Sequence, residues 1–245
     1  MTAHPIAFTA RVLRVAKTEI GLVVPLLLGA AGLALFAGIA DGVASGDKQG
    51  FDWSILSWMH PYADEPARMR GPWWLHEAAM DITALGGISV LIVFGLIFGF
   101  FLLVHGKKLS ALLLAVGLAG GVALSEGLKV MFDRPRPPAE YQAVETLNAS
   151  FPSGHALLAT VFYLTIGVML TRAYPRARMK AYAMAWAVVV VLLIGLTRIY
   201  LAAHWATDVL AGWGIGAFWA VLLWLFAYVI ERRQRVHMSR LQDEP

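Results

Sequence analysis

Three short segments of the sequence carry basic, hydroxyl and imidazole side chains, the kinds that bind anions and react with them. In the first, EGLKVMFDRPRPP at positions 126–138, Lys129 and Arg136 lie seven positions apart. Prolines at 135, 137 and 138 prevent a helix there, so Arg136 is expected on a stiff, extended segment. Alternatively, the two cations only reach from a membrane edge to water, and the prolines only end a helix.

The second segment, PSGH at positions 152–155, stands directly before an apolar run. Ser153 is a favourable N-cap for a helix that begins at this point. Gly154 allows a ligand to approach the backbone closely, and the first N–H groups of a helix attract anions. A plain helix cap followed by an incidental His155 explains the same residues.

The third segment, TRIYLAAHWATDVLAG at positions 197–212, carries Arg198, His204 and Asp208. His204 and Asp208 are four positions apart, so they share one face if a helix begins there. A carboxylate in that position fixes the tautomer of the imidazole and stabilises its cation, which lets the histidine act as a nucleophile or base. A salt bridge at a helix end is the alternative.

The hydropathy of the chain indicates that these segments join membrane spans. Of 245 residues, 59% are hydrophobic and 15% charged, against about 25% charged in an average soluble domain. A helix needs about 20 apolar residues to cross the hydrocarbon of a membrane. Unpaired backbone N–H and C=O groups are costly there, and a helix pairs them all within the segment. The sequence predicts an all-α integral membrane protein, a six-helix bundle that forms a single domain over residues 1–245. The expected spans are approximately 20–40, 87–105, 109–128, 155–171, 181–198 and 208–230.

The distribution of charge predicts the orientation of these spans. Thirteen of the twenty Lys and Arg residues lie in the two termini and in the loops at 105–108 and 171–180, all on one side. The positive-inside rule therefore places both termini in the cytoplasm and all three segments on the outer face. The first outer loop contains FDWSILSWMHPY at 51–62, and its tryptophans predict a short helix lying along the membrane interface.

Together the three segments offer two imidazoles, three permanent cations, a carboxylate and a helix N-terminus at one membrane face. Ionisable groups at the edges of spans are costly and are typically functional. Such a set suits a dianion, and phosphate is the evident one. The basic residues are divided among separate loops, so the net charge of +4 does not predict nucleic-acid binding.

The order and spacing of the three segments resemble the type 2 phosphatidic acid phosphatase (PAP2) superfamily. The corresponding residues are Lys129 to Arg136-Pro137, then Pro152-Ser153-Gly154-His155, then Thr197-Arg198 to His204 and Asp208. The third motif of the family usually begins with Ser, whereas this chain has Thr197. The motifs cover about 80 residues, and the six-span layout extends the resemblance over most of the chain.

The resemblance implies a role for each of these residues. His204 is the expected nucleophile that forms a phosphohistidine, Asp208 orients it, and His155 is the general acid. The remaining residues are expected to bind phosphate: Lys129, Arg136, Ser153, Gly154 and Arg198. No metal or other cofactor is expected, since the cations stabilise the charge and HEAAMD at 76–81 lacks a second His at the zinc-binding spacing.

The expected function is a membrane lipid phosphatase that acts in the bacterial inner membrane, on its periplasmic or extracellular face. The substrate stays open among phosphatidate, phosphatidylglycerophosphate, undecaprenyl pyrophosphate and lipid A, and so does the oligomeric state. A phosphotransferase that passes the phosphoryl group to an acceptor lipid is the main alternative. A transporter or a non-enzymatic scaffold is remote. The polar residues of a transporter should lie within its spans rather than cluster at one membrane face; only Ser125 and Glu126 come near this pattern, and Glu126 is expected to pair with Lys129.

Overall fold

The computed structural model describes residues 5–46, 49–144, 146 and 148–243 of the chain. Every regular element in these residues is a helix, which confirms the all-α prediction. The helices are α1 (Pro5–Ser45), α2 (Gln49–Met59), α3 (Trp73–Ala84), α4 (Ile88–Val104), α5 (Lys108–Phe132), the 3₁₀ helix η1 (Ala139–Tyr141), α6 (Gly154–Ala173), α7 (Ala177–Tyr200) and α8 (Ala206–Asp243).

Five of these helices are long and apolar enough to cross a membrane: α1 over Leu22–Ser45, α5, α6, α7, and α8 over Ala206–Gln234. The remaining expected span, 87–105, corresponds to α4, which has only 17 residues. It reaches crossing length together with α3, and the two helices meet at 50° across a short break. With this bent pair counted as one span, the described residues contain six candidate spans, the number that the hydropathy predicts.

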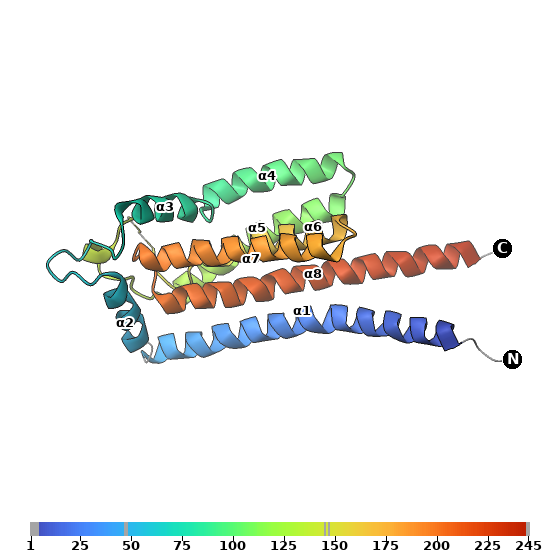
Figure 1. Ribbon diagram of the computed structural model, residues 1–245, viewed down its shortest axis with the longest axis horizontal. Coiled ribbons are helices and arrows are strands. Elements are labelled where there is room, and N and C mark those ends of the chain that lie inside the picture. The colour runs from blue at the N-terminus through green and yellow to red at the C-terminus, as the bar shows by residue number, and fades with distance from the viewer. Residues whose placement is uncertain (1–4, 47–48, 145, 147, 244–245) are drawn as a thin grey trace.

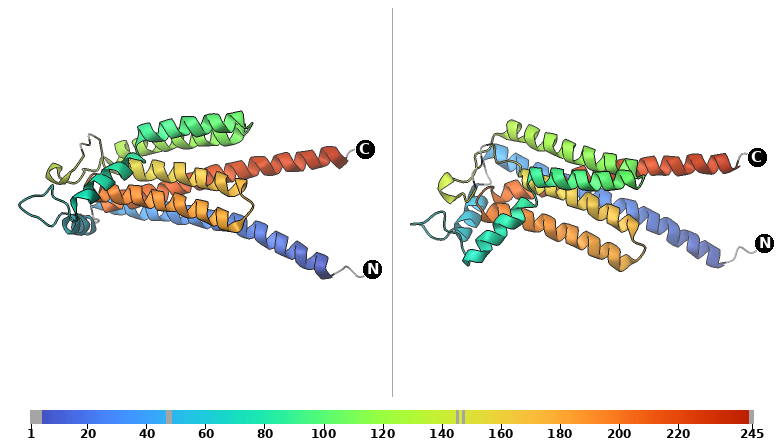
Figure 2. Two further views of the ribbon diagram at one scale, coloured as in Figure 1. Left: turned by 45° about the horizontal axis from the view of Figure 1, so that its top comes forward. Right: turned by 90° about the horizontal axis from the view of Figure 1, so that it is seen from above.

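The long helices run side by side, and both chain ends lie at the same end of the bundle (Figure 1). Helix α6 packs against α5, α7 and α8, while α1 lies along α8 (Figure 2). Helices α2 and α3 and the loop that contains η1 lie at the end opposite to the termini (Figure 1). The three candidate segments therefore share one end of the bundle.

Helices α6 and α8 approach closely because glycines of α8 face the backbone of α6. A Cβ atom at Gly212 would lie 2.7 Å from the carbonyl oxygen of Ser153, and one at Gly216 would lie 2.8 Å from that of Leu157. The contact also links the two helix starts, since the N–H of Ser153 donates to the carbonyl of Asp208 at 3.0 Å. A side chain at Gly212 would separate two parts of the candidate site.

Apolar side chains fill the interior of the bundle and also cover its outer surface. Leu91, Leu157 and Phe162 are buried in a cluster between α4, α5, α6 and α8. On the outside of α4, Leu96 is 69% exposed and Phe100 is 70% exposed. Apolar surface of this kind is costly in water and is suited to a lipid environment.

Helix α2 confirms the short helix predicted in the first outer loop, whereas its position in the membrane interface stays a prediction. It lies across the end of the bundle, inclined to the long helices (Figure 1). Phe51 and Trp58 are exposed on it. Trp53 packs edge-on against Trp205, with ring centroids 5.3 Å apart. One carboxylate of this helix, Asp52, is buried beneath the surface.

Candidate active site

The structure brings the three sequence segments together around one cavity of about 580 Å³. Lys129 comes from the last turns of α5, and Arg136 comes from the proline-containing loop that follows. The first turn of α6, the end of α7 and the turn before α8 supply the rest. Six of the eight predicted site residues line this cavity: Lys129, Arg136, Gly154, His155, Arg198 and His204.

His204 and Asp208 form the pair that the spacing predicts. Nδ1 of His204 lies 3.5 Å from Oδ2 of Asp208, longer than a typical N–H···O hydrogen bond, and no described residue forms a hydrogen bond with it. The other ring nitrogen, Nε2, lies 3.3 Å from Nη1 of Arg136, on the side of the cavity. Because a guanidinium can only donate, Nε2 is the acceptor in this contact, which places the proton on Nδ1 and the lone pair of Nε2 on the cavity side.

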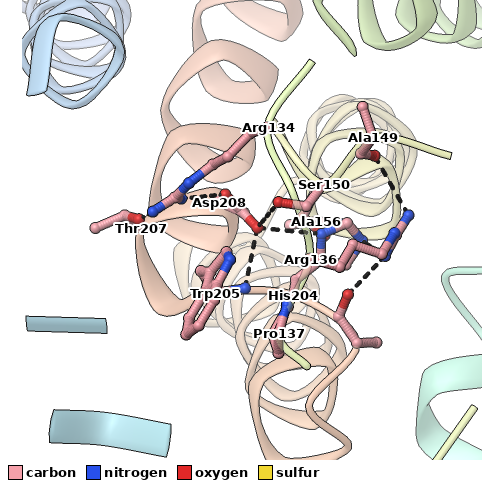
Figure 3. Close-up of polar contacts among 12 residues, drawn as sticks. Arg134, Arg136, Pro137, Ala149, Ser150, Ala156, His204, Trp205, Thr207 and Asp208 are labelled. Atoms are coloured by element: carbon pink, nitrogen blue, oxygen red, sulfur yellow. Dashed lines mark hydrogen bonds and ion pairs between the residues drawn. The ribbon is translucent and has the colours of Figure 1, made fainter. Parts of the chain in front are cut away.

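Asp208 is completely buried, and several donors hold its carboxylate (Figure 3). Oδ2 accepts hydrogen bonds from Oγ of Ser150 at 2.7 Å and from the backbone N–H of Trp205 at 2.9 Å. Oδ1 accepts from Nη1 of Arg134. With this many donors, the carboxylate cannot rotate away from His204 without losing bonds that are costly to leave unmade.

Burial lowers the pKa of His204 to about 4, from an ordinary value of 6.5. The carboxylate of Asp208 opposes this shift, and the positive charges of Arg136 and Arg198 add to it. The imidazole is therefore neutral at neutral pH, which is the state that a nucleophile or general base needs.

Arg136 lies outside regular helix, as its prolines predict, and backbone and amide oxygens hold its guanidinium. It donates to the carbonyls of Asn148 and Ala203, each at 2.6 Å, and to Oδ1 of Asn148 at 2.7 Å. Burial lowers the pKa of Arg136, although the charges of Asp208 and Glu126 oppose the shift. The arginine joins the loop after α5 to the turn that carries His204.

The other two cations reach the cavity from α5 and α7. Lys129 is buried and pairs with Glu126 at 2.7 Å, which confirms the pairing predicted from their spacing. Arg198 is also buried, and its Nη1 donates to Oγ1 of Thr83 at 3.1 Å. Its Nε is buried with no partner among the described residues. This unpaired N–H is a donor that an anion in the cavity can use.

Ser153 caps α6, as predicted: its Oγ accepts from the N–H of Ala156 at 3.5 Å. Ser153 is fully buried and does not line the cavity, whereas Gly154 and His155 do. A Cβ atom at Gly154 would lie 3.1 Å from Oγ of Ser125 and 3.7 Å from Nζ of Lys129. Glycine thus keeps open the space between the start of α6 and the lysine.

Thr197, which replaces the usual serine of the third motif, uses its hydroxyl within α7. Oγ1 donates to the carbonyl of Ile194 at 2.7 Å, and the side chain is buried. Asp208 likewise does not line the cavity and instead contacts His204 from behind. The sequence pattern alone did not separate these supporting positions from those that face the cavity.

A buried charge network behind Asp208 was missed by the sequence analysis. Arg134 donates to Asp208 and Thr207 through Nη1 (Figure 3). Its Nη2 donates to Oδ2 of Asp52 at 2.7 Å. Asp52 also accepts from the backbone N–H of Thr207 at 2.9 Å. Nothing in the sequence marks this partnership, because Asp52 precedes Thr207 by 155 positions and lies in an aromatic-rich helix.

The described part of the chain contains no group of three His, Cys, Asp or Glu side chains suited to a metal ion. The site is instead defined by cations and by donors directed at a common space. Such a set can bind an anion and place a neutral imidazole against it.

Comparisons with known proteins match both the sequence and the fold of this chain. The PAP2 superfamily matches residues 110–232. Phosphatidylglycerophosphatase B of Bacillus subtilis is 33% identical over 144 residues, which are 58% of this chain and 70% of that protein. A lipid A 1-phosphatase of Rhizobium johnstonii is 34% identical over 74 residues, 30% of this chain and 26% of that protein.

Two crystal structures resemble the whole bundle. The transmembrane PAP2 type phosphatidylglycerolphosphate phosphatase of Bacillus subtilis superposes with a TM-score of 0.74 at 27% identity, over 82% of this chain and 96% of that chain. LpxE of Aquifex aeolicus shares the fold, with a TM-score of 0.52 at 23% identity over 70% of this chain and 93% of that chain. The chain therefore belongs to the PAP2 superfamily and is a membrane enzyme of that lipid-phosphatase family.

Proposed function

We propose that the chain hydrolyses the phosphate ester or diphosphate of a membrane lipid through a phosphohistidine on His204. The observation that carries this proposal is a buried, neutral imidazole that lines a cavity with Arg136 and Arg198 and has Asp208 behind it. The family membership supports the reaction class, and the geometry supports the role given to each residue.

In the first step, Nε2 of His204 attacks phosphorus, and the bond from phosphorus to the lipid oxygen breaks. His155, which also lines the cavity, donates a proton to the leaving oxygen. The imidazole of His204 gains positive charge as the new bond forms, and the Asp208 carboxylate stabilises that charge. The products are a lipid alcohol, or a lipid phosphate from a diphosphate, and the phosphohistidine.

In the second step, water attacks the phosphohistidine while His155 accepts its proton, which releases inorganic phosphate and restores His204. Lys129, Arg136 and Arg198 stabilise the charge on the transferring oxygens in both steps, together with the first N–H groups of α6. Ser153 contributes through the helix cap, in which its hydroxyl oxygen accepts from the N–H of Ala156.

A lipid substrate is supported by the walls of the cavity. Gly86, Ile88, Val122 and Leu158 line it beside the cations, so an apolar chain can lie next to a bound phosphate. One relative is named phosphatidylglycerophosphatase B, so phosphatidylglycerophosphate is the first compound to test. Phosphatidate, undecaprenyl pyrophosphate and lipid A complete the panel, with lipid A suggested by the second relative.

The site is proposed to face the periplasm or cell exterior, with both termini in the cytoplasm of a bacterial inner membrane. The charge bias of the loops supports this orientation. Because the chain has no cysteine, single cysteines can report it. Ala139 and Ala173 are exposed at opposite ends of the bundle. In intact cells, an impermeant thiol reagent should label Ala139→Cys but not Ala173→Cys, and the reverse pattern would invert the orientation.

The chemistry is tested by phosphate release from the lipid panel in detergent micelles. His204→Ala should reduce release to background, because it removes the imidazole that takes up the phosphoryl group in the proposed first step. His155→Ala should be slow mainly with poor leaving groups, since a good leaving group needs little protonation. His105→Ala is the matched control, because His105 is exposed at the end of α4 and its ring contacts Phe101 of the same helix.

Rapid quenching under alkaline conditions should trap labelled phosphate on the wild type and not on His204→Ala. Near wild-type release by His204→Ala would overturn the mechanism. Adding a lipid alcohol as acceptor distinguishes hydrolysis from phosphoryl transfer. Hydrolysis predicts inorganic phosphate as the main product with or without the acceptor, whereas a phosphotransferase would form a new lipid phosphate.

A further inference from the structure

A hydroxyl outside the three motifs lies unpaired beside the predicted phosphate position. Ser125 is on α5, one turn before Lys129, and is only 1% exposed. Its Oγ has no hydrogen-bond partner among the described residues. A buried hydroxyl without a partner is costly, and native proteins rarely keep one without a use for it.

Several other helix hydroxyls among the described residues bond to a carbonyl of their own helix, whereas that of Ser125 does not. Ser54 and Ser57 each donate to the carbonyl four residues earlier at 2.8 Å, and Thr160 does so at 2.6 Å. This back-bonding is the usual solution for a hydroxyl in a helix. The hydroxyl of Ser125 is directed elsewhere.

Ser125 faces the space between α5 and the start of α6. Its Oγ lies 3.1 Å from the position of a Cβ atom on Gly154, and Nζ of Lys129 lies 3.7 Å from the same point. Ser125 also lines the cavity that contains His155 and His204. The hydroxyl, the ammonium group and the glycine backbone therefore border one gap.

A second unpaired donor borders the same cavity. Nε of Arg198 is buried and has no partner among the residues described. Two buried donors directed at one cavity, next to cations, indicate a ligand with several acceptor oxygens. An apolar ligand would leave both groups unsatisfied.

We propose that Oγ–H of Ser125 donates a hydrogen bond to a non-bridging oxygen of the bound phosphate, beside the ammonium group of Lys129. Ser125 is then a phosphate-binding residue in addition to those of the three motifs. The identification of the anion as phosphate rests on the proposed function. The contact itself rests on the burial, direction and missing partner of the hydroxyl.

The test measures the binding of inorganic phosphate and orthovanadate to the purified full chain in detergent. Both probes supply the oxygens of the anion without a lipid tail. Affinity is read from inhibition of lipid-phosphate hydrolysis and, independently, from the rise in melting temperature with probe concentration. The variants are Ser125→Ala, Ser125→Cys and the matched control Ser110→Ala, which lies at the other end of α5.

Ser125→Ala should bind both probes roughly ten- to a hundredfold more weakly, as expected for a lost hydrogen bond to a charged group. Ser125→Cys keeps the side-chain volume but offers only a weak S–H donor, so it should show a similar loss. Ser110→Ala should bind like the wild type. If Ser125→Ala does not fold, the cysteine variant carries the test alone.

Wild-type probe affinity in both Ser125 variants would overturn the proposal. So would a lower melting temperature without any change in its dependence on the probe, because that result indicates a structural role only. These outcomes differ from a failure of the proposed function. A wild-type chain that binds orthovanadate but releases no phosphate from any lipid would contradict the function and leave the Ser125 contact standing.

Discussion

Replacing Asp52 by Asn tests whether α2 supports the nucleophile through the buried charge network. Asp52 does not line the cavity that contains His204, so it cannot contact a phosphate bound there. It acts through Arg134, which bridges Asp52 and Asp208. The substitution preserves the size of the side chain and removes its charge.

The expected loss of stability follows from the three hydrogen bonds that Asp52 accepts. One oxygen receives the N–H of Thr207 at 2.9 Å, and the other receives the Thr207 hydroxyl at 2.6 Å and Nη2 of Arg134 at 2.7 Å. If the amide oxygen of the asparagine keeps the bond from the N–H of Thr207, its N–H₂ group points at the guanidinium of Arg134. One charge-assisted bond is then lost, at a cost of about 1.5–3 kcal/mol.

Breaking a buried ion pair by removing one partner typically costs about 3–5 kcal/mol. Here Asp208 still compensates Arg134, so the lower figure applies, and a loss of about 2–3 kcal/mol is expected. For a chain of this size, each kcal/mol lowers the melting temperature by about 2–4 °C. The melting temperature of Asp52→Asn should therefore fall by about 4–12 °C.

The substitution should also slow the chemical step. With Asp52 neutral, Asp208 alone balances the charge of Arg134, so less of the Asp208 charge is left to stabilise the imidazole of His204, which becomes positive during attack. We expect kcat to fall about tenfold, which corresponds to 1.4 kcal/mol of transition-state stabilisation. KM should stay near the wild-type value, because Asp52 has no contact with the cavity.

The assay is steady-state phosphate release in detergent combined with a thermal melt. Asp64→Asn is the control: Asp64 is an exposed carboxylate in the loop after α2, and its loss should change neither quantity. Wild-type kcat in Asp52→Asn, whatever its melting temperature, would refute the link to His204. A rise in KM with unchanged kcat would contradict it as well.

Three further predictions concern pH, metal ions and chain length. Since burial lowers the pKa of His204 to about 4, the acid limb of kcat/KM, corrected for ionisation of the substrate, should lie nearer 4 than 6.5. In the unfolded chain His204 has its ordinary pKa of 6.5, so as the pH falls it is protonated there before it is protonated in the folded chain. His204 should therefore leave the stability unaffected above pH 6.5 and reduce it as the pH falls from 6.5 to 4, as measured by thermal melts. Activity should persist in excess EDTA, and a strict requirement for added Mg²⁺ would contradict a site built from cations alone. Long-chain lipid phosphates should be hydrolysed far better than short-chain analogues at equal concentration, since each CH₂ removed from water contributes about 0.8 kcal/mol; equal rates would contradict a lipid substrate.

The helices could be predicted from the sequence because their signal is local. Apolar runs such as 181–198 show the span without knowledge of any neighbour, and α7 at Ala177–Tyr200 matches it within a few residues. The pair formed by His204 and Asp208 could be predicted for a related reason. The two residues are only four positions apart at the start of α8, so local geometry brings them together.

The network around Arg134 could not be predicted, because it depends on where α2 packs. Arg134 and Arg136 are both arginines beside prolines. The family motif selects Arg136 for the phosphate, but nothing in the sequence assigns Arg134 to Asp208. The bend between α3 and α4 was missed for a different reason. Hydropathy detects only the apolar part of a span, so the expected span began at 87 and left out α3.

The charges near the cavity suggest why the site suits a dianion. Lys129 pairs with Glu126, and Arg134 is shared by Asp52 and Asp208. By contrast, Arg136 and Arg198 have only neutral partners among the described residues, namely carbonyl, amide, imidazole and hydroxyl acceptors, and neither forms an ion pair there. Two cations thus stand in a buried site without a carboxylate of their own.

Buried charges of one sign are costly unless a counter-charge is present. A phosphate group with two negative charges supplies it, while a neutral or singly charged headgroup leaves one arginine uncompensated. Binding such an anion should therefore relieve an electrostatic cost of the fold as well as form new bonds. This reasoning links the missing carboxylates at Arg136 and Arg198 to selectivity for the phosphate end of the substrate, and it makes a rise in thermal stability with phosphate a property of the site itself.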